Sequence, residues 1–217
     1  RNVVSRVGEG WTCRLVKGAR PARFTEMFLR KAALRPVPRH AVVDEHFVQL
    51  VEAQLDAHED DLQGVLDRGY AELDRRQPAL SDWLAEQLAD GNDELVQSLG
   101  YFLVITVYMA FREAFPTRLE EVDERSLQLA LETLSVDEEL RANDPTETLD
   151  SDDVVAMGQP AVLDFVQHHV EEAIEQAEGE VALDELDHVY RALLVEVIAL
   201  SHAVTGPRGE DRTNLVS

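Results

Sequence analysis

Two groups of histidine and carboxylate residues in the C-terminal half have spacings that could hold a metal ion. Asp164, His168 and Glu172 are four residues apart, so they lie on one face of a helix. Glu185 and His188 form a Glu-x-x-His pair, which di-iron helical bundles use because side chains at i and i+3 converge. These five residues are the metal-site candidates of one alternative hypothesis, a metal-binding helical-bundle protein or enzyme.

The number of such ligands argues against a dimetal centre. That centre needs two Glu-x-x-His pairs and two further glutamates, whereas the sequence has one pair. The sequence also lacks a glycine-rich phosphate-binding loop, a Gly-x-Ser-x-Gly nucleophile turn and a zinc-type Cys/His spacing. We therefore predict no catalytic residue and no cofactor, and we expect a protein that is not an enzyme.

Glu196 interrupts the otherwise apolar run ALLVEVIAL. A carboxylate in the middle of an apolar helix must be paired, lie at the helix edge or have a shifted pKa. Glu196 is therefore the candidate for a buried charge. We expect structural pairing, with Arg191, Arg112 or a partner's arginine as the cation.

Repeated sequence blocks indicate how the chain is organised. VDEHFVQLVEAQL begins at Val43 and VDERSLQLALETL at Val122, while QPALSDWL begins at Gln77 and QPAVLDFV at Gln159. A third pair of blocks, Asp-Glu-Leu, opens two long apolar runs. Three pairs in the same order predict an internal duplication of about 80 residues, although amphipathic helices with similar starts resemble one another in any case.

Each block has the apolar spacing of a helix, and no segment shows the alternation of a strand. Proline suits the first helical turn, so each QPA block marks a helix start, and Asp93 and Asp184 are expected to cap the third helices. Those third helices are apolar nearly all round, which is typical of buried central helices. We predict an all-α helical bundle of two similar three-helix units, 43–115 and 122–204, with an extra helix at 60–75.

Charge divides the 217 residues unevenly. Residues 1–40 carry a net charge of +8 and residues 41–217 a net charge of −31. We expect a basic, disordered extension at 1–40, an acidic helical domain at 41–205 and a flexible tail at 206–217. If Met27 is the natural start, the residues before it are an upstream extension.

The acidity of residues 41–217 limits the classes of partner that the protein can bind. A net charge of −31 repels nucleic acid and anionic membrane surfaces, so neither is expected as a partner. The longest uncharged run, Leu95 to Phe111, has 17 residues, fewer than the ~20 of a membrane span, and predicts a buried helix. Cys13 is the single cysteine, which excludes an internal disulfide and favours a cytoplasmic location.

These observations favour a non-enzymatic helical protein-binding or adaptor protein whose partner is another protein. The acidity has two interpretations that the sequence leaves open: a solvated surface of an Arg-over-Lys composition, or a face that binds a basic partner. A further alternative is a chaperone that holds a client helix, which would need an apolar groove between the two units.

Overall fold

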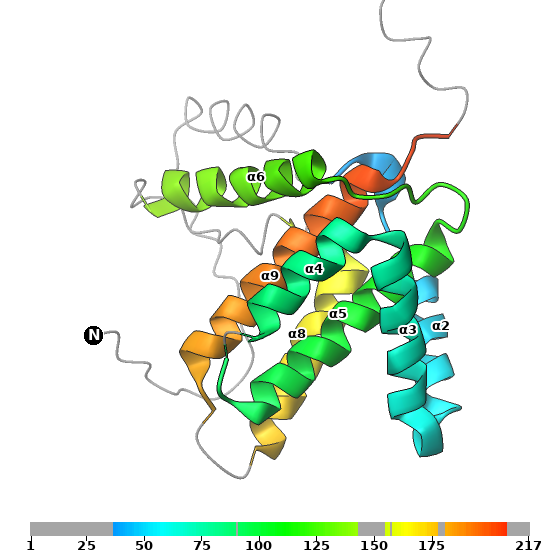
Figure 1. Cartoon of the computed structure of the whole chain (residues 1–217), viewed down its shortest axis with the longest axis vertical. Coiled ribbons are helices and arrows are strands. Elements are labelled where there is room, and N and C mark those ends of the chain that lie inside the picture. Colours follow the sequence, from blue (N-terminus) through cyan, green and yellow to red (C-terminus); the bar gives the residue numbers. More distant parts are fainter. Residues whose placement is uncertain (1–36, 90, 143–154, 157, 178–180, 208–217) are drawn as a thin grey trace, which may run out of the picture. The chain divides into compact units, whose positions relative to one another are not determined.

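The computed structural model describes residues 37–89, 91–142, 155–156, 158–177 and 181–207, with the side chains of 137 and 140–142 excepted. These residues form seven α-helices and no strand, which confirms the all-α helical bundle (Figure 1). The helices are α2 (Glu45–Asp56), α3 (Leu62–Arg76), α4 (Pro78–Ala89), α5 (Glu94–Ala114), α6 (Glu124–Ala142), α8 (Pro160–Gln176) and α9 (Leu183–Ala203). Two short 3₁₀ helices, Arg39–Ala41 and Glu59–Asp61, accompany them.

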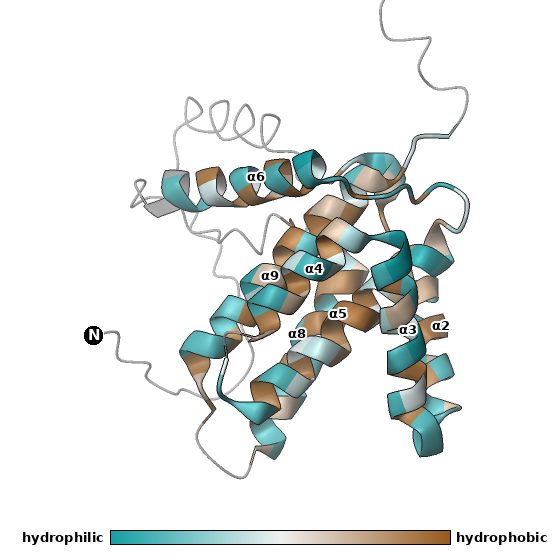
Figure 2. Ribbon diagram, viewed as in Figure 1, coloured by the Kyte–Doolittle hydropathy of each residue, from teal (hydrophilic) through white to brown (hydrophobic). Residues whose placement is uncertain are grey.

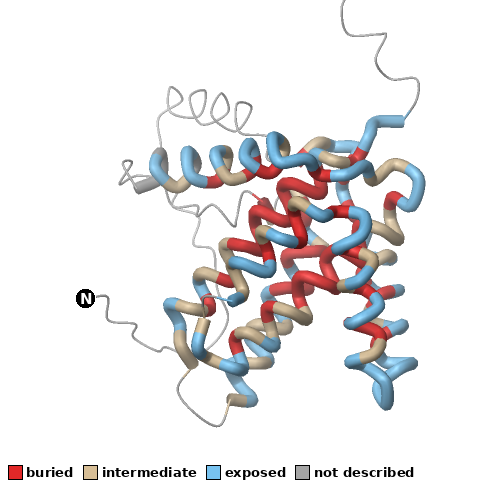
Figure 3. The backbone as a smooth tube through the Cα atoms, in the orientation of Figure 1, coloured by how far each residue is buried: buried red, intermediate tan, exposed pale blue. Residues whose placement is uncertain are grey.

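The two longest described helices, α5 and α9, form the centre of the core, as their apolar sequences predict. Figures 2 and 3 show apolar and buried positions concentrated on this pair. A Cβ at Gly100 of α5 would lie 2.6 Å from Leu88 of α4 and 2.9 Å from Val189 of α9. Glycine is therefore required at this position, because a Cβ would clash with both neighbouring helices.

The helices of the two predicted units are interleaved. From the first unit, α2 and α3 pack on α5, whereas α4 packs on both α5 and α9. From the second unit, α6 packs on α9, while α8 packs on α2 and α5. Each unit therefore contributes to the core of the other, and a surface shared by α2 and α8 necessarily lies between the units.

Asp93 caps helix α5, as predicted. Its Oδ1 accepts hydrogen bonds from the backbone N–H groups of Leu95 (2.9 Å) and Val96 (3.2 Å), and its Oδ2 accepts one from Ala182 (3.2 Å). The hydrogen bond from Ala182, followed by those from Val96 and Leu95, lowers the pKa of Asp93 and outweighs the opposing effect of desolvation.

The predicted cap at Asp184 is wrong. Helix α9 begins at Leu183, and the preceding residue, Ala182, makes no side-chain cap. Instead, Glu185 in the first turn of α9 accepts hydrogen bonds at Oε2 from the N–H groups of Asn92 and Asp93, each at 2.8 Å. The starts of the two central helices are thus joined to each other by Asp93 and Glu185, because each carboxylate accepts an amide from the other segment.

We expect Asp93→Ala to lower the midpoint of thermal unfolding at neutral pH, because the backbone N–H groups of Leu95, Val96 and Ala182 lose their acceptor. The pKa of Asp93 is lower in the folded state than in the unfolded state. The carboxylate therefore stabilises the fold fully at pH values above its unfolded pKa of about 3.9. This stabilisation disappears as the pH falls through the folded-state pKa. The difference from wild type, measured by circular dichroism, should therefore shrink in acid. Asp184→Ala is the control, and an equal loss in both variants would contradict the assignment.

Gln159, immediately before α8, holds the segment that leads into α2. Its Oε1 accepts a hydrogen bond from Val43 N–H (2.8 Å), and its Nε2 donates to the carbonyl of Ala41 (2.6 Å) and to Oγ of Ser201 (3.0 Å). Gln159 is fully buried. The start of α8 and the approach to α2 are therefore fixed to each other although they are far apart in the sequence.

Gln77, immediately before α4, makes the matching contacts at the approach to α6. Its Oε1 accepts from Val122 N–H (2.7 Å), and its Nε2 donates to the carbonyl of Glu120 (2.9 Å). We call Gln77 and Gln159 the two glutamine clamps. Each clamp binds the segment that precedes the Val-Asp-Glu block of the other unit. This match is what a duplication predicts, and the duplication itself stays a prediction.

Residues 37–40, which the prediction assigned to the basic extension, are described by the structure and contact the helical domain. Val37 is buried, and the ring of His40 donates through Nε2 to the carbonyl of Val204 at 2.9 Å. The predicted disordered extension up to residue 36, the predicted loop at 143–153 and most of the predicted tail lie outside the described residues.

Helix α5 is long and apolar enough to cross a membrane, and it is the one described helix with that property. In the fold, however, 61% of its most apolar window is buried inside the protein. The buried side chains contact α2, α3 and α9, so α5 has the surroundings of a core helix.

Candidate docking groove

The structure separates the five predicted metal ligands. Asp164 and His168 line a groove, whereas Glu172 lies one turn further along α8 and is not part of the lining. Glu185 is engaged at the start of α5, and Nε2 of His188 is buried without a hydrogen-bond partner among the described residues. Within the described part of the chain, no three His, Cys, Asp or Glu side chains form a group that could hold a metal ion.

The groove that contains Asp164 and His168 runs between α2 and α8 and has a volume of about 450 Å³. One wall comes from the first predicted unit and the other from the second. We call it the α2–α8 groove. Its lining residues are Val42, Val43, Asp44, Glu45, Val48, Gln49, Glu52, Pro160, Ala161, Asp164, Phe165 and His168.

Two local features position the walls. Asp44 caps α2 by accepting a hydrogen bond at Oδ1 from His46 N–H (3.0 Å), which starts the helix at the mouth of the groove. Gln159 precedes α8, with Pro160 in the first turn, and its side chain bonds Val43 at the foot of the other wall. The same glutamine clamp therefore sets the separation of the two walls.

The groove combines an apolar floor with an acidic rim. Val43, Val48 and Phe165 are buried and form the floor. The rim carries four carboxylates, Asp44, Glu45, Glu52 and Asp164, and no lysine or arginine is among the lining residues. Such a surface favours a ligand that is cationic and amphipathic, because the rim attracts positive charge and the floor accepts apolar side chains.

Phe165, one of the three floor residues, packs against two further aromatic rings. The ring of Phe165 lies 6.3 Å from that of Phe102 and 4.4 Å from that of His169, centroid to centroid. Burial, followed by the nearby His168, lowers the pKa of His169, and Glu172 opposes this shift. The half-buried imidazole of His169 is therefore neutral at physiological pH and packs against the two phenyl rings.

Glu196 is completely buried, as predicted, but the expected ion pair with Arg191 or Arg112 does not form. Neither carboxyl oxygen has a hydrogen-bond partner among the described residues. Arg191 instead donates to Glu138 of α6, with Nε to Oε1 at 2.8 Å. Desolvation alone raises the pKa of Glu196 well above its ordinary value. Glu196 is thus held in its neutral form in the core, away from the groove lining.

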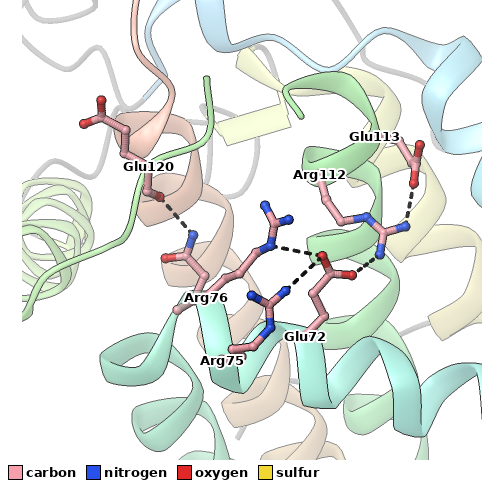
Figure 4. A network of polar contacts seen from close by, with 7 residues as sticks. Glu72, Arg75, Arg76, Arg112, Glu113 and Glu120 are labelled. Atoms are coloured by element: carbon pink, nitrogen blue, oxygen red, sulfur yellow. Dashed lines mark hydrogen bonds and ion pairs between the residues drawn. The ribbon is translucent and has the colours of Figure 1, made fainter. Parts of the chain in front are cut away.

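The other expected partner, Arg112, belongs to a charge network between α3 and α5 (Figure 4). It donates to Glu72 and to Glu113, while Glu72 also pairs with Arg76 at 3.0 Å and with Arg75 at 3.8 Å. Both terminal nitrogens of the Arg112 guanidinium therefore already have carboxylate partners. The arginine therefore stabilises the contact of α3 with α5 and is not available to Glu196.

Sequence reasoning missed most of the groove. It singled out Asp164 and His168 for their spacing along one helix, but it assigned them to a metal site. The other wall carries Asp44, Glu45 and Glu52. The signal that could have joined the walls was the coincidence of the two repeated blocks, because the clamp residue opens one block and bonds the first residue of the other.

Comparisons of the chain with protein-family models, with curated proteins and with solved structures found no match.

Proposed function

We propose that the protein is a non-enzymatic protein-binding or adaptor protein, and that the α2–α8 groove binds a basic amphipathic helix of a partner protein. The observation that carries this proposal is the acidic rim over an apolar floor, formed by two helices held together by Gln159. The proposed partner is a protein because a body with a net charge of −31 repels nucleic acid and anionic membranes.

The dimensions of the lining favour a helical ligand. Glu45 to Glu52 on α2 and Pro160 to His168 on α8 each cover about two helical turns, or roughly 12 Å. An amphipathic helix docks in such a groove through apolar side chains at i, i+3, i+4 and i+7. Arginine or lysine residues that flank this apolar face would lie against the acidic rim.

The test is a calorimetric titration of the full chain with a synthetic helical peptide of about 14 residues, leucine at i, i+3, i+4 and i+7 and arginine elsewhere. We call this the leucine–arginine peptide. Asp164→Arg reverses one rim charge, and we expect it to weaken binding roughly tenfold. The matched control is Asp60→Arg, which changes an exposed carboxylate outside the groove and should leave the affinity unchanged.

A scrambled peptide of the same composition separates docking from charge attraction. The leucine–arginine peptide should keep measurable affinity as salt rises, because apolar contacts are not screened, whereas the scrambled peptide should lose it. Equal binding of both peptides, or equal weakening by the Asp164 and Asp60 variants, would contradict the proposal.

A chaperone that holds a client helix is the second candidate, and the position of the groove between the two predicted units favours it. A chaperone would depend more on the floor than on the rim. If the protein is such a chaperone, a peptide with its arginines replaced by glutamine should still bind the groove. If it is an adaptor specific for a basic helix, this peptide should not bind. The metal-binding alternative has no supporting cluster in the described residues.

We also propose a cytoplasmic location. This proposal rests on the sequence, which has a single cysteine, Cys13, and therefore no means of forming an internal disulfide.

A further inference from the structure

A second surface repeats the arrangement of the groove lining. Aligning the sequences of the repeated blocks, with Val43 against Val122 and Gln159 against Gln77, assigns each lining residue an equivalent on α4, on α6 or just before α6. We call this set the α4–α6 face. Its residues are Pro78, Ala79, Asp82, Trp83, Glu86, Glu121, Val122, Asp123, Glu124, Leu127, Gln128 and Leu131.

The two surfaces carry identical residues at seven of their twelve equivalent pairs and agree in burial at eleven. Charge or polarity differs between Val42 and Glu121, between Glu52 and Leu131, and between His168 and Glu86. At every equivalent pair but one, both residues are buried, both half-buried or both exposed. The exception is Phe165, which is buried, against Trp83, which is half-buried. The identical pairs are Val43 and Val122, Asp44 and Asp123, Glu45 and Glu124, Gln49 and Gln128, Pro160 and Pro78, Ala161 and Ala79, and Asp164 and Asp82.

The backbone frame of the two surfaces is also the same. Gln77 bonds Val122 N–H and the carbonyl two residues earlier, as Gln159 does at Val43. Helices α4 and α6 are in contact, as α2 and α8 are. Since the clamps fix the start of one helix against the approach to the other, equivalent side chains are presented from equivalent positions.

The chemistry of the α4–α6 face fits the ligand proposed for the groove. Its positions carry the carboxylates Asp82, Glu86, Glu121, Asp123 and Glu124 and no lysine or arginine. Its aromatic residue is a half-buried tryptophan, a residue type enriched among those that dominate binding energy. Charge complementarity therefore again selects a basic amphipathic helix.

We infer that the α4–α6 face is a second docking surface for a basic amphipathic helix, so that one chain binds two such helices. This inference rests on the proposed function of the groove. It makes the protein bivalent, with one binding surface on α2 and α8 and the other on α4 and α6. A partner with two basic helices would gain avidity from the pair.

The test uses the full chain with Trp11→Phe, which leaves Trp83 as the only tryptophan. Titration with the leucine–arginine peptide is followed by calorimetry for stoichiometry and by Trp83 fluorescence for occupancy of the second face. We expect two peptides per chain and a shift of the Trp83 emission. Asp82→Arg should weaken the binding of one of the two peptides roughly tenfold and move the Trp83 emission change to higher peptide concentration. Asp164→Arg should weaken the other peptide and leave the Trp83 titration unchanged.

The outcomes distinguish this inference from the proposal on which it rests. One peptide per chain, weakened by Asp164→Arg and without any change of Trp83 emission, would overturn the second face and leave the groove intact. No binding of the peptide to the Trp11→Phe chain would overturn both. Two peptides whose binding is insensitive to Asp82→Arg would also overturn the assignment of the second face.

Discussion

Replacing Glu196 by methionine is expected to raise the free energy of unfolding at neutral pH by about 2 kcal/mol, because a buried polar group without a partner costs roughly 1–3 kcal/mol. Methionine has a similar length and carries no group that needs a hydrogen bond. The gain should appear in urea denaturation as a higher midpoint at an unchanged slope.

Glu196→Met should also remove the part of the pH dependence of the unfolding free energy that comes from this carboxyl group. The folded-state pKa of Glu196 is raised above its unfolded value, so the folded protein holds the proton more tightly. Stability from this group is fully present below the unfolded pKa of about 4.3 and falls as pH rises toward the folded value. The advantage of Glu196→Met over wild type should therefore grow between acid and neutral pH.

An exposed glutamate provides the control for Glu196→Met. Glu175 on α8 is exposed, so Glu175→Met should change the unfolding free energy little and should not alter its pH dependence. If Glu196→Met instead destabilised the protein at neutral pH, Glu196 would have to be ionised and paired in the fold, and the account of an unpaired, neutral carboxyl would be wrong.

Gln159→Leu is expected to lower the free energy of unfolding by about 4 kcal/mol. The substitution leaves Val43 N–H and the carbonyl of Ala41 without partners in a buried place, and each such group costs roughly 1–3 kcal/mol. Gln77→Leu should cost less, because the Glu120 carbonyl that it releases is only partly buried. Urea denaturation of both variants measures the difference.

Binding gives a second readout for the clamps. Gln159 joins the walls of the α2–α8 groove, so Gln159→Leu, in conditions where it is folded, should weaken the groove's affinity for the leucine–arginine peptide. Gln77→Leu should leave the groove's affinity unchanged, because that clamp holds α4 and α6. Equal stability and equal groove affinity in wild type and Gln159→Leu would show that the hydrogen bonds of Gln159 do not hold the walls.

The helices could be predicted from the sequence because their causes are local. Pro78 and Pro160 mark first turns, Asp93 caps α5, and the long apolar runs identify the central pair. Asp184 did not become a cap, although its local sequence resembles that of Asp93. The amide of Ala182 bonds Asp93 instead, and that contact joins segments that are distant in the chain.

The groove and the state of Glu196 depend on long-range packing, which no local pattern contains. The α2–α8 groove exists because Gln159 bonds Val43 and brings α8 beside the first helix of the other unit. Glu196 was correctly identified as a carboxylate in an apolar helix. It lacks a partner because Arg112 and Arg191 pair with other carboxylates, Glu72 and Glu138. Those partners lie on α3 and α6, which the sequence did not place next to either arginine.

The most direct test of the docking function is an NMR titration of the ¹⁵N-labelled full chain with the leucine–arginine peptide at high salt. We expect the backbone amide shifts to concentrate on the groove residues, Val43 to Glu52 and Ala161 to His168, with a second set on the α4–α6 face. Small shifts spread over acidic residues of every helix, disappearing as salt is added, would instead show that the peptide is attracted by net charge alone, and would contradict a docking groove.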